Sequence, residues 1–164
     1  MRAATGQRAI EGDKAARIVD AMRESVAQRG VAGSTFDHVA RDARVSRGLL
    51  HYYFGTKERL LAEVVRRDCD LRLAGLDAAL AGAHTAEDLL DVLDGLVRSL
   101  DDLVDNDPEF LVLIFELFVL ARRNEEIAVE FAELLRRQRE RLAEVLRAKA
   151  TAGVLHLRAE PEAI

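Results

Sequence analysis

Residues 34–61 read STFDHVARDARVSRGLLHYYFGTKERLL. Apolar side chains recur at helical spacing in two short stretches of this segment, at about residues 35–43 and about residues 46–53. A turn of roughly three residues separates the two stretches. Two short helices joined in this way form a helix-turn-helix, whose second helix enters the major groove of DNA. The segment therefore predicts such a motif over residues 35–54.

Glycines and hydroxyl side chains indicate where these helices begin and end. A first helix with an apolar stripe starts near Asp13, and Gly30 suits the left-handed position that follows a helix. Ser34, with Asp37 three residues later, predicts a capping box for the first short helix. Ser46 is the expected N-cap of the second. The sequence thus predicts three helices within residues 13–54.

The remainder of the chain is also predicted to be helical. Only 2 of its 164 residues are proline and 10 are glycine, and its apolar residues keep a helical period. Further helices are expected over about 57–81, along the leucine stripe of 89–103, over 108–121 and over about 127–152. We expect an all-α fold with three parts: a flexible basic arm at 1–12, a helix-turn-helix domain at 13–60 and a helical regulatory domain at 61–164.

Charge is distributed unevenly along the chain. Residues 1–67 carry a formal charge of +5 and residues 68–164 a charge of −10, which give the net −5. A basic first part can face a polyanion even though the whole chain has a pI of about 5.4. Chance clustering of surface charge is the alternative. Four cations bracket the second short helix of the motif: Arg41, Arg44, Arg47 and Lys57.

Lys57 and Arg47 each stand at the start of a predicted helix, where a cation needs an explanation. The helix dipole disfavours Lys57 by about 0.3–1 kcal/mol, and a phosphate bound at the same helix start would offset this cost. A solvated lysine that tolerates the penalty is the alternative. Arg47 can bind O6 and N7 of guanine in a bidentate manner, contact a phosphate, or remain a free surface side chain.

Residues 34–40 and 45–61 resemble the TetR (tetracycline-repressor-like) family of transcriptional regulators, and the similarity extends over residues 13–65. Its most specific part is the aromatic cluster with Phe54 and Lys57 placed before Leu60 and Leu61. The resemblance implies a three-helix DNA-binding domain completed by the start of a fourth helix. It also implies a helical second domain that binds a small effector and dimerises. By position, the DNA contacts of the family fall on Thr35, Arg44, Ser46, Arg47, Gly48, Leu49, His51, Tyr52 and Lys57.

Two of these residues depart from the family pattern. Arg44 stands where the family usually has glycine in the turn, and a left-handed arginine costs roughly 1–2 kcal/mol unless the turn differs. Its side chain can also add a DNA contact. His51 stands where the family more often has tyrosine to contact a phosphate. The helical period further predicts that one of Tyr52 and Tyr53 is buried and the other exposed.

The second half resembles one common subgroup of the family around Glu116. This carboxylate lies in an apolar run, where it can meet a cationic effector, pair with Arg122 or Arg123, or face water. Phe115, Glu116 and Phe118 are therefore candidate effector-binding residues.

Core packing is the stronger expectation for the phenylalanines of this run, Phe110 included. Gln138, on the apolar face of the last long helix, is a further polar candidate.

Residues 159–164 resemble the opening of another helix, because a proline and flanking acids stand in its first turn. The family usually continues with one or two helices that pack two subunits into a four-helix bundle. We expect either that the chain is cut short before these helices or that it dimerises through earlier ones.

Other classes of function lack their motifs. A single cysteine excludes an internal disulfide and a multi-cysteine metal site, and no HExxH, GxSxG or phosphate-loop motif is present. No apolar run approaches the ~18–20 residues of a membrane span, and the first residues lack the apolar stretch of a secretory signal. We expect a soluble cytoplasmic protein that is not an enzyme and needs no metal or cofactor.

The sequence therefore predicts a DNA-binding transcriptional regulator. We expect a homodimeric repressor that a small-molecule effector releases from its double-stranded operator. A helical protein-interaction module that does not bind DNA is the alternative.

Overall fold

The computed structural model describes residues 2–155, and it describes side chains from Gly12 to Leu155. This part of the chain forms seven helices and contains no strand, so the prediction of an all-α fold is confirmed. The helices are α1 (Arg2–Gly33), α2 (Phe36–Asp42), α3 (Arg47–Phe54), α4 (Lys57–Gly82), α5 (Ala86–Asn106), α6 (Pro108–Ala121) and α7 (Glu125–Thr151).

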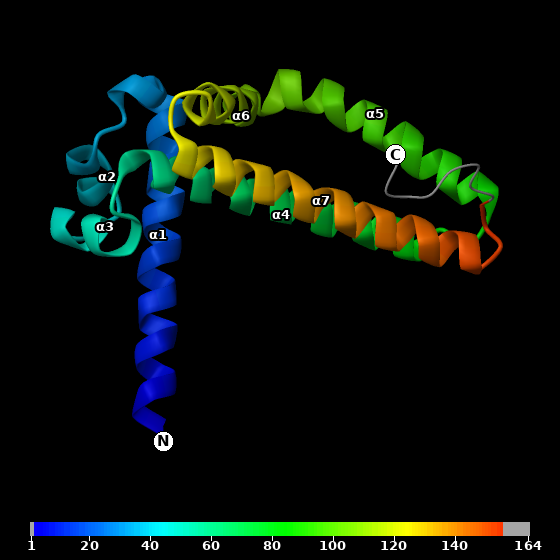
Figure 1. Ribbon diagram of the computed structural model, residues 1–164, viewed down its shortest axis with the longest axis horizontal. Helices are drawn as coiled ribbons and strands as arrows, with labels where there is room; N and C mark the ends of the chain where they lie inside the picture. Colours follow the sequence, from blue (N-terminus) through cyan, green and yellow to red (C-terminus); the bar gives the residue numbers. More distant parts are fainter. Residues whose placement is uncertain (1, 156–164) are drawn as a thin grey trace.

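The first three helices gather at one end of the molecule, and α4 leads away from them (Figure 1). The helix α7 lies beside α4, and α5 forms the opposite side of the long body. The shorter α6 packs against α1, α4, α5 and α7. Helix α4 therefore belongs both to the N-terminal end and to the long body.

One apolar core joins the two ends. Met22 of α1, Leu50 of α3 and Leu60 of α4 are fully buried, and the same cluster continues to Leu117 of α6 and Leu134 of α7. The core is thus continuous across the boundary expected near residue 60. A shift of α4 or α7 would consequently change the position of α2 and α3.

The N-terminal segment differs from the expectation of a loose arm at residues 1–12, because α1 begins at Arg2. Three alanines favour the helix here, and no proline interrupts it before Asp13. Residue 1 and the helix opening expected at 159–164 lie outside the described residues.

The cap of α2 is one residue later than expected. Thr35, not Ser34, is the N-cap, and its Oγ1 accepts a hydrogen bond from the backbone N–H of His38 at 3.3 Å. Ser34 is fully buried, and its Oγ donates to the carbonyl of Gly30 at 2.8 Å. Its hydroxyl therefore satisfies a carbonyl near the end of α1. Gly30 itself has φ 68°, the left-handed conformation that its sequence position predicts.

The turn between α2 and α3 contains the strained residue. Arg44 has φ 56°, and it is the one non-glycine residue of the described chain with a positive φ. Of the two alternatives that the sequence left open, a left-handed arginine or a different turn, the structure has the left-handed arginine, whose backbone cost is roughly 1–2 kcal/mol. The side chain itself is exposed. The strained conformation is therefore required by the direction of the backbone in the turn and not by packing of the side chain.

Substitution of Arg44 tests this strain. Arg44→Gly should have a free energy of unfolding about 1 kcal/mol higher than Arg44→Ala, because glycine adopts a positive φ without steric cost. Both variants lose the same charge, so the comparison isolates the backbone. Denaturant unfolding monitored by circular dichroism measures the difference, and an alanine variant at least as stable as the glycine variant would contradict a left-handed turn.

Candidate nucleic-acid interface and ligand cavity

Helix α3 has one buried and one exposed face. Leu50 is completely buried, whereas Arg47 and Gly48 are exposed and Tyr52 is 76% exposed. Leu49 is half-buried at the edge between the two faces. Tyr53, by contrast, is half-buried and packs partly against the core, as the helical period predicts. The structure thus presents the outer face of α3 to any macromolecule that approaches this end.

Arg47 has a partner within the chain. Its Nη1 lies 3.1 Å from Oδ2 of Asp37 on α2, and both side chains are more than half exposed. Such an exposed pair contributes little to stability. Arg47 can therefore exchange Asp37 for another acceptor at small cost.

Lys57 has a partner that neither alternative considered. Its ammonium donates a hydrogen bond to the backbone carbonyl of Val31, near the end of α1. The side chain is half-buried at the first residue of α4. An ammonium group has three N–H donors, so this contact fixes Lys57 in place and leaves donors for an anion. A contact between residues 26 positions apart has no local sequence signal.

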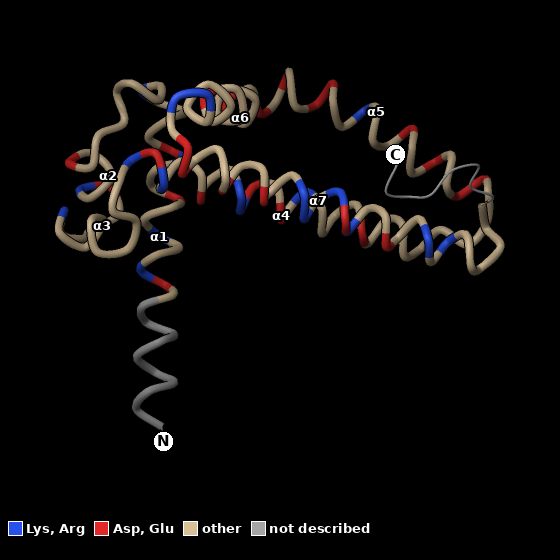
Figure 2. The backbone as a smooth tube through the Cα atoms, viewed as in Figure 1, with Lys and Arg blue, Asp and Glu red and all other residues tan. Residues whose placement is uncertain are grey.

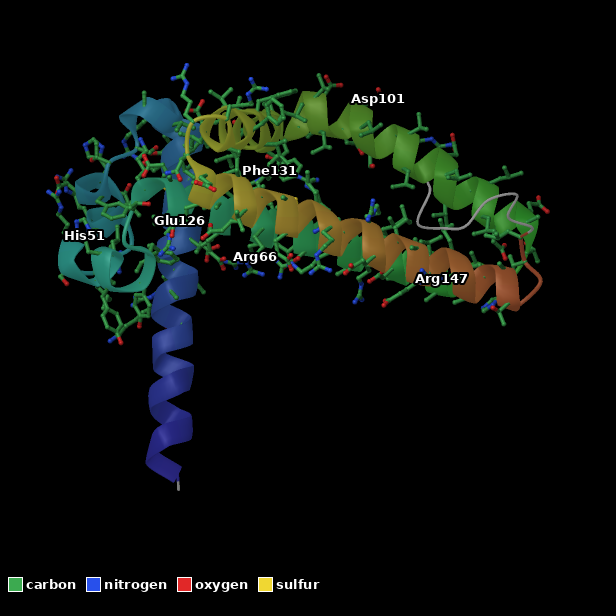
Figure 3. All side chains as sticks on the ribbon, viewed as in Figure 1. His51, Arg66, Asp101, Glu126, Phe131 and Arg147 are labelled. Carbon is green, nitrogen blue, oxygen red and sulfur yellow. The ribbon has the colours of Figure 1, made fainter. Side chains whose placement is uncertain are left out.

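The other predicted contact residues surround this face. Thr35 and Ser46 are exposed N-caps, and the hydroxyl of Ser46 makes no capping hydrogen bond. His51 is exposed at the outer end (Figure 3). One ring nitrogen of His51 lies 3.1 Å from the carbonyl of Gly55, and the ring meets Phe36 edge to face at 4.8 Å. The imidazole is therefore held in a defined orientation.

The charges around α3 contrast with those of α5. Arg44 lies in the turn, Arg47 begins α3, and α2 carries Arg41 between Asp37 and Asp42, whereas α5 carries a row of acidic residues (Figure 2). The nine predicted contact residues come from the start of α2, the turn, α3 and the first residue of α4. The structure brings all of them to the N-terminal end.

The comparisons with known proteins agree with this geometry. The family model described as bacterial regulatory proteins of the tetR family matches residues 18–64. The HTH-type transcriptional regulator BetI of Agrobacterium fabrum is 32% identical over 110 residues, which are 66% of this chain and 52% of that protein. The chain belongs to the TetR family. It spans about half the length of this curated relative.

Solved structures of transcriptional regulators share the fold over most of the chain. A TetR-family protein from Mesorhizobium loti superposes with a TM-score of 0.75 at 18% identity, over 93% of this chain and 75% of its own. The regulator FadR of Bacillus subtilis, solved with stearoyl-CoA, gives a TM-score of 0.65 at 20% identity, over 90% of this chain and 76% of its own. The second part of this TetR-family chain thus has the helical architecture that the resemblance implies.

A cavity of about 740 Å³ lies between α4, α5 and α7 of this TetR-family fold. Its wall is mostly apolar, with Leu73 and Leu76 from α4 and Leu96 from α5. The polar groups that reach it include Arg72 and Gln138. Few polar groups in an apolar wall are typical of small-molecule sites. The sequence indicated Gln138, but the apolar periodicity could not distinguish a cavity wall from a filled core.

The predicted effector-binding residues lie elsewhere. Phe115, Glu116 and Phe118 are on α6, and none of them is among the residues that line this cavity. Phe115 is 66% exposed and Phe118 is 54% exposed, so the expectation of core packing is wrong for both and holds only for Phe110.

The helical period gives the reason. Phe110, Leu113 and Leu117 form the buried stripe of α6, and Phe115 and Phe118 fall on the opposite face. Glu116 is half-buried and forms no ion pair with Arg122 or Arg123 among the described contacts.

Among the described residues, no three His, Cys, Asp or Glu side chains gather as metal ligands. None of the described helices combines the length and apolarity needed to cross a bilayer.

Cys69 lines the cavity and provides a test of its apolar environment. Burial raises the pKa of the thiol to about 11, and the neighbouring carboxylates of Asp68 and Asp70 add to the effect. Near neutral pH the thiolate fraction, and hence alkylation by iodoacetamide, should be about 100-fold lower than for a thiol at the ordinary value of 9.0. The rate should rise about tenfold for each pH unit up to that pKa.

The urea-unfolded protein is the control for this alkylation experiment, because its thiol is solvated. Mass spectrometry can follow both reactions. Equal rates in the native and unfolded protein would show that Cys69 is not in a desolvated wall.

Proposed function

We propose that this chain is a DNA-binding transcriptional regulator whose α3 reads the major groove. One observation carries the proposal: α3 buries Leu50 and exposes Arg47 and Tyr52 on its outer face, next to the cations Arg44 and Lys57. The relatives named as regulators support it, and so does the match of residues 18–64 to the family model. A protein-interaction module would have no need for this cationic face.

The proposed contacts divide into two kinds. Arg47 and Gly48, in the first turn of α3, are placed for base edges, because the N-terminal residues of such helices reach into the groove. Thr35, Ser46, His51, Tyr52 and Lys57 are placed for phosphates, which fix the orientation of the protein on the duplex. Arg44 and Leu49 complete the surface at the turn and at the edge of α3.

We further propose that the regulator acts as a homodimer. Two reading helices would then contact half-sites about 34–36 Å apart, or a multiple of that distance. The outer face of α6 supports this proposal, because Val112, Phe115, Phe118 and Val119 leave a row of large apolar side chains exposed in the single chain. Burial of such a row between two copies would be favourable.

A small molecule in the cavity between α4, α5 and α7 is the proposed effector, and its binding would release the operator. The apolar wall and the few polar groups support this site. FadR of the same fold was solved with stearoyl-CoA, so this architecture accommodates a small molecule. The continuous core between the cavity helices and α3 gives a physical route for the effect.

Removal of Lys57 tests the phosphate contact. The probe is a DNA duplex selected from a random pool by the wild-type protein, with binding measured by fluorescence anisotropy at several salt concentrations. Lys57→Ala should weaken binding by a similar factor for selected and random duplexes and reduce the salt slope by about 1.

Lys149→Ala is the matched control, because the Lys149 ammonium also donates to a backbone carbonyl, that of Ala83, at 2.6 Å and far from α3. Equal loss of DNA affinity in both variants would show that Lys57 acts through the stability of the fold and not through a phosphate contact.

Arg47→Ala should affect sequence preference instead. Loss of a bidentate guanine contact costs about 1–3 kcal/mol at one base pair and relaxes the preference there. Repeated selection from the random pool with this variant measures the change. An unaltered consensus, together with unaltered affinity, would remove Arg47 from the interface.

Asp37→Asn tests whether the internal ion pair competes with DNA. The substitution frees Arg47 and removes a negative charge from the interface, so we expect the Kd for the selected duplex to fall a few-fold. Asp94→Asn is the control, since Asp94 forms a similarly exposed pair with Arg98 on α5. A weaker complex with Asp37→Asn would mean that the pair holds Arg47 in its reading position.

A further inference from the structure

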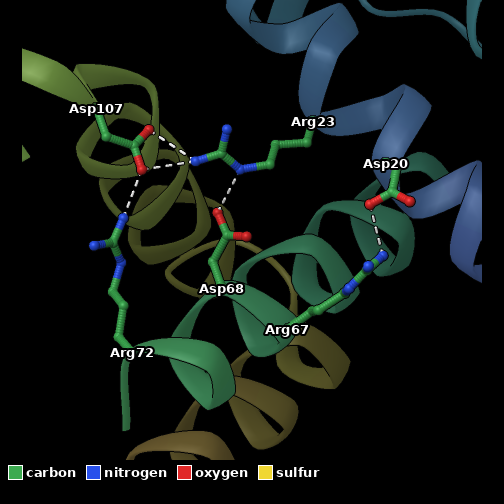
Figure 4. Close-up of polar contacts among 6 residues, drawn as sticks. All are labelled: Asp20, Arg23, Arg67, Asp68, Arg72 and Asp107. Carbon is green, nitrogen blue, oxygen red and sulfur yellow. Dashed lines mark hydrogen bonds and ion pairs between the residues drawn. The ribbon is translucent and has the colours of Figure 1, made fainter. Parts of the chain in front are cut away.

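A network of four charged residues joins three helical elements. Arg23 of α1 donates from Nε to Oδ2 of Asp68 on α4 at 2.8 Å, and from Nη2 to both carboxylate oxygens of Asp107 at 2.7 and 2.8 Å (Figure 4). Arg72 of α4 donates from Nη2 to Oδ2 of the same Asp107 at 2.5 Å. Asp107 stands between α5 and α6, so its carboxylate ties α1 and α4 to the start of α6.

The network is partly removed from water. The side chain of Asp68 is 11% exposed and that of Asp107 is 24% exposed. Hydrogen bonds between charged groups are shorter and stronger than neutral ones, and loss of one partner in such a place is costly. The position of α1 relative to α6 therefore depends on how Asp107 is shared between the two guanidinium groups.

Arg72 is the one described residue that belongs to this network and also lines the cavity between α4, α5 and α7. Its guanidinium carbon lies 4.1 Å from the centre of the Phe110 ring, and Phe110 is buried in the core. The ring holds the guanidinium plane in place. A guanidinium has five N–H donors, of which the contact with Asp107 uses one, so Arg72 can offer a pair of donors to a second anion.

We propose that Arg72 recognises an anionic group, a carboxylate or sulfonate, on an otherwise apolar ligand of this cavity, and that its partial release of Asp107 transmits ligand binding to Arg23 and α1. This inference rests on the proposed function for the cavity and names the ligand class and its coupling. When Arg72 turns part of its donor set to the ligand, its hold on Asp107 weakens and Asp107 depends more strongly on Arg23. The change alters the charged network, which positions α1. Helix α2 packs against α1, and α3 packs against α2.

The wall offers one competing charge, Asp91 on α5. This carboxylate could bind a cation, but among the described residues no hydrogen bond or ion pair connects Asp91 with Arg23, Asp68 or Asp107. A cation held there would have no direct polar route to α1. The geometry accordingly favours an anion at Arg72.

A matched pair of fluorescent probes tests the charge of the ligand. The sulfonated naphthalene dye 8-anilinonaphthalene-1-sulfonate and its sulfonate-free analogue N-phenyl-1-naphthylamine share the same apolar body. We expect the sulfonate to bind the full chain about tenfold more tightly, as for a hydrogen bond to a charged group, and Arg72→Gln to abolish this difference. Equal affinities for the wild-type chain, or a difference that survives Arg72→Gln, would overturn the assignment.

The probe must also be located in the cavity. Gly95 lines the cavity, and a Cβ built on it meets no heavy atom within 4 Å. Gly95→Trp should therefore fill the cavity and suppress binding of both probes. Unchanged binding would place the probes elsewhere and overturn the proposed ligand site.

Hydrogen–deuterium exchange tests the coupling without DNA. Addition of the sulfonate probe should change amide exchange in residues 13–29 of α1 in the wild-type chain, and Asp107→Asn should remove most of that change while the probe affinity stays within about twofold. The matched control is Asp77→Asn on α4, because Asp77 pairs with Arg141 and its side chain is similarly exposed, at 22%. A response of α1 that persists in Asp107→Asn would overturn the network as the route.

The same probes report separately on the proposed function. In the wild-type chain, the sulfonate should change the Kd for the selected duplex, and Asp107→Asn should bring this fold-change close to 1. A chain that selects no duplex contradicts the proposed function, whereas the probe and exchange results still decide the role of Arg72.

Discussion

The backbone conformation of Arg44 determines how α3 is presented. A positive φ at this residue turns the chain between α2 and α3 within a few residues, and Leu50 can then enter the core that Met22 and Leu60 share. Since burial of Leu50 fixes the rotation of α3, Arg47 and Tyr52 must face outward. Every feature of the proposed interface depends on this combination of a strained turn and one buried leucine.

Helix α4 connects the two proposed activities of the chain. Its first residue, Lys57, donates a hydrogen bond to the carbonyl of Val31 near the end of α1. Its middle supplies Asp68 and Arg72 to the charged network. Farther along, Leu76 lines the cavity. Helix α4 therefore contacts the proposed DNA interface, the charged network and the ligand site. A displacement of α4 at one of these places consequently acts on the other two.

Local signals in the sequence predicted much of the fold. The helical period indicated the helices, Gly30 indicated the end of the first one, and the spacing around Ser46 indicated the helix-turn-helix. Where two neighbouring residues offered the same chemistry, the sequence did not decide between them: Thr35 caps α2, while Ser34 turns inward to Gly30.

Long-range contacts account for what the sequence did not reveal. The hydrogen bond from Lys57 to Val31 and the ion pair between Arg23 and Asp107 link residues far apart in the chain. No sequence periodicity predicts these contacts. The cavity is likewise a property of how α4, α5 and α7 are spaced. The run around Phe115 and Phe118 is apolar except for Glu116, so its pattern alone predicts core packing for both phenylalanines, whereas only the face with Leu113 and Leu117 is buried.

Amide chemical shifts of the isotope-labelled chain, recorded during titration with the selected duplex, test the central claim most directly. We expect the largest changes in residues 44–57 and small changes along α7. Largest changes on α5 to α7, with α3 unaffected, would contradict the claim that the exposed face of α3 meets DNA.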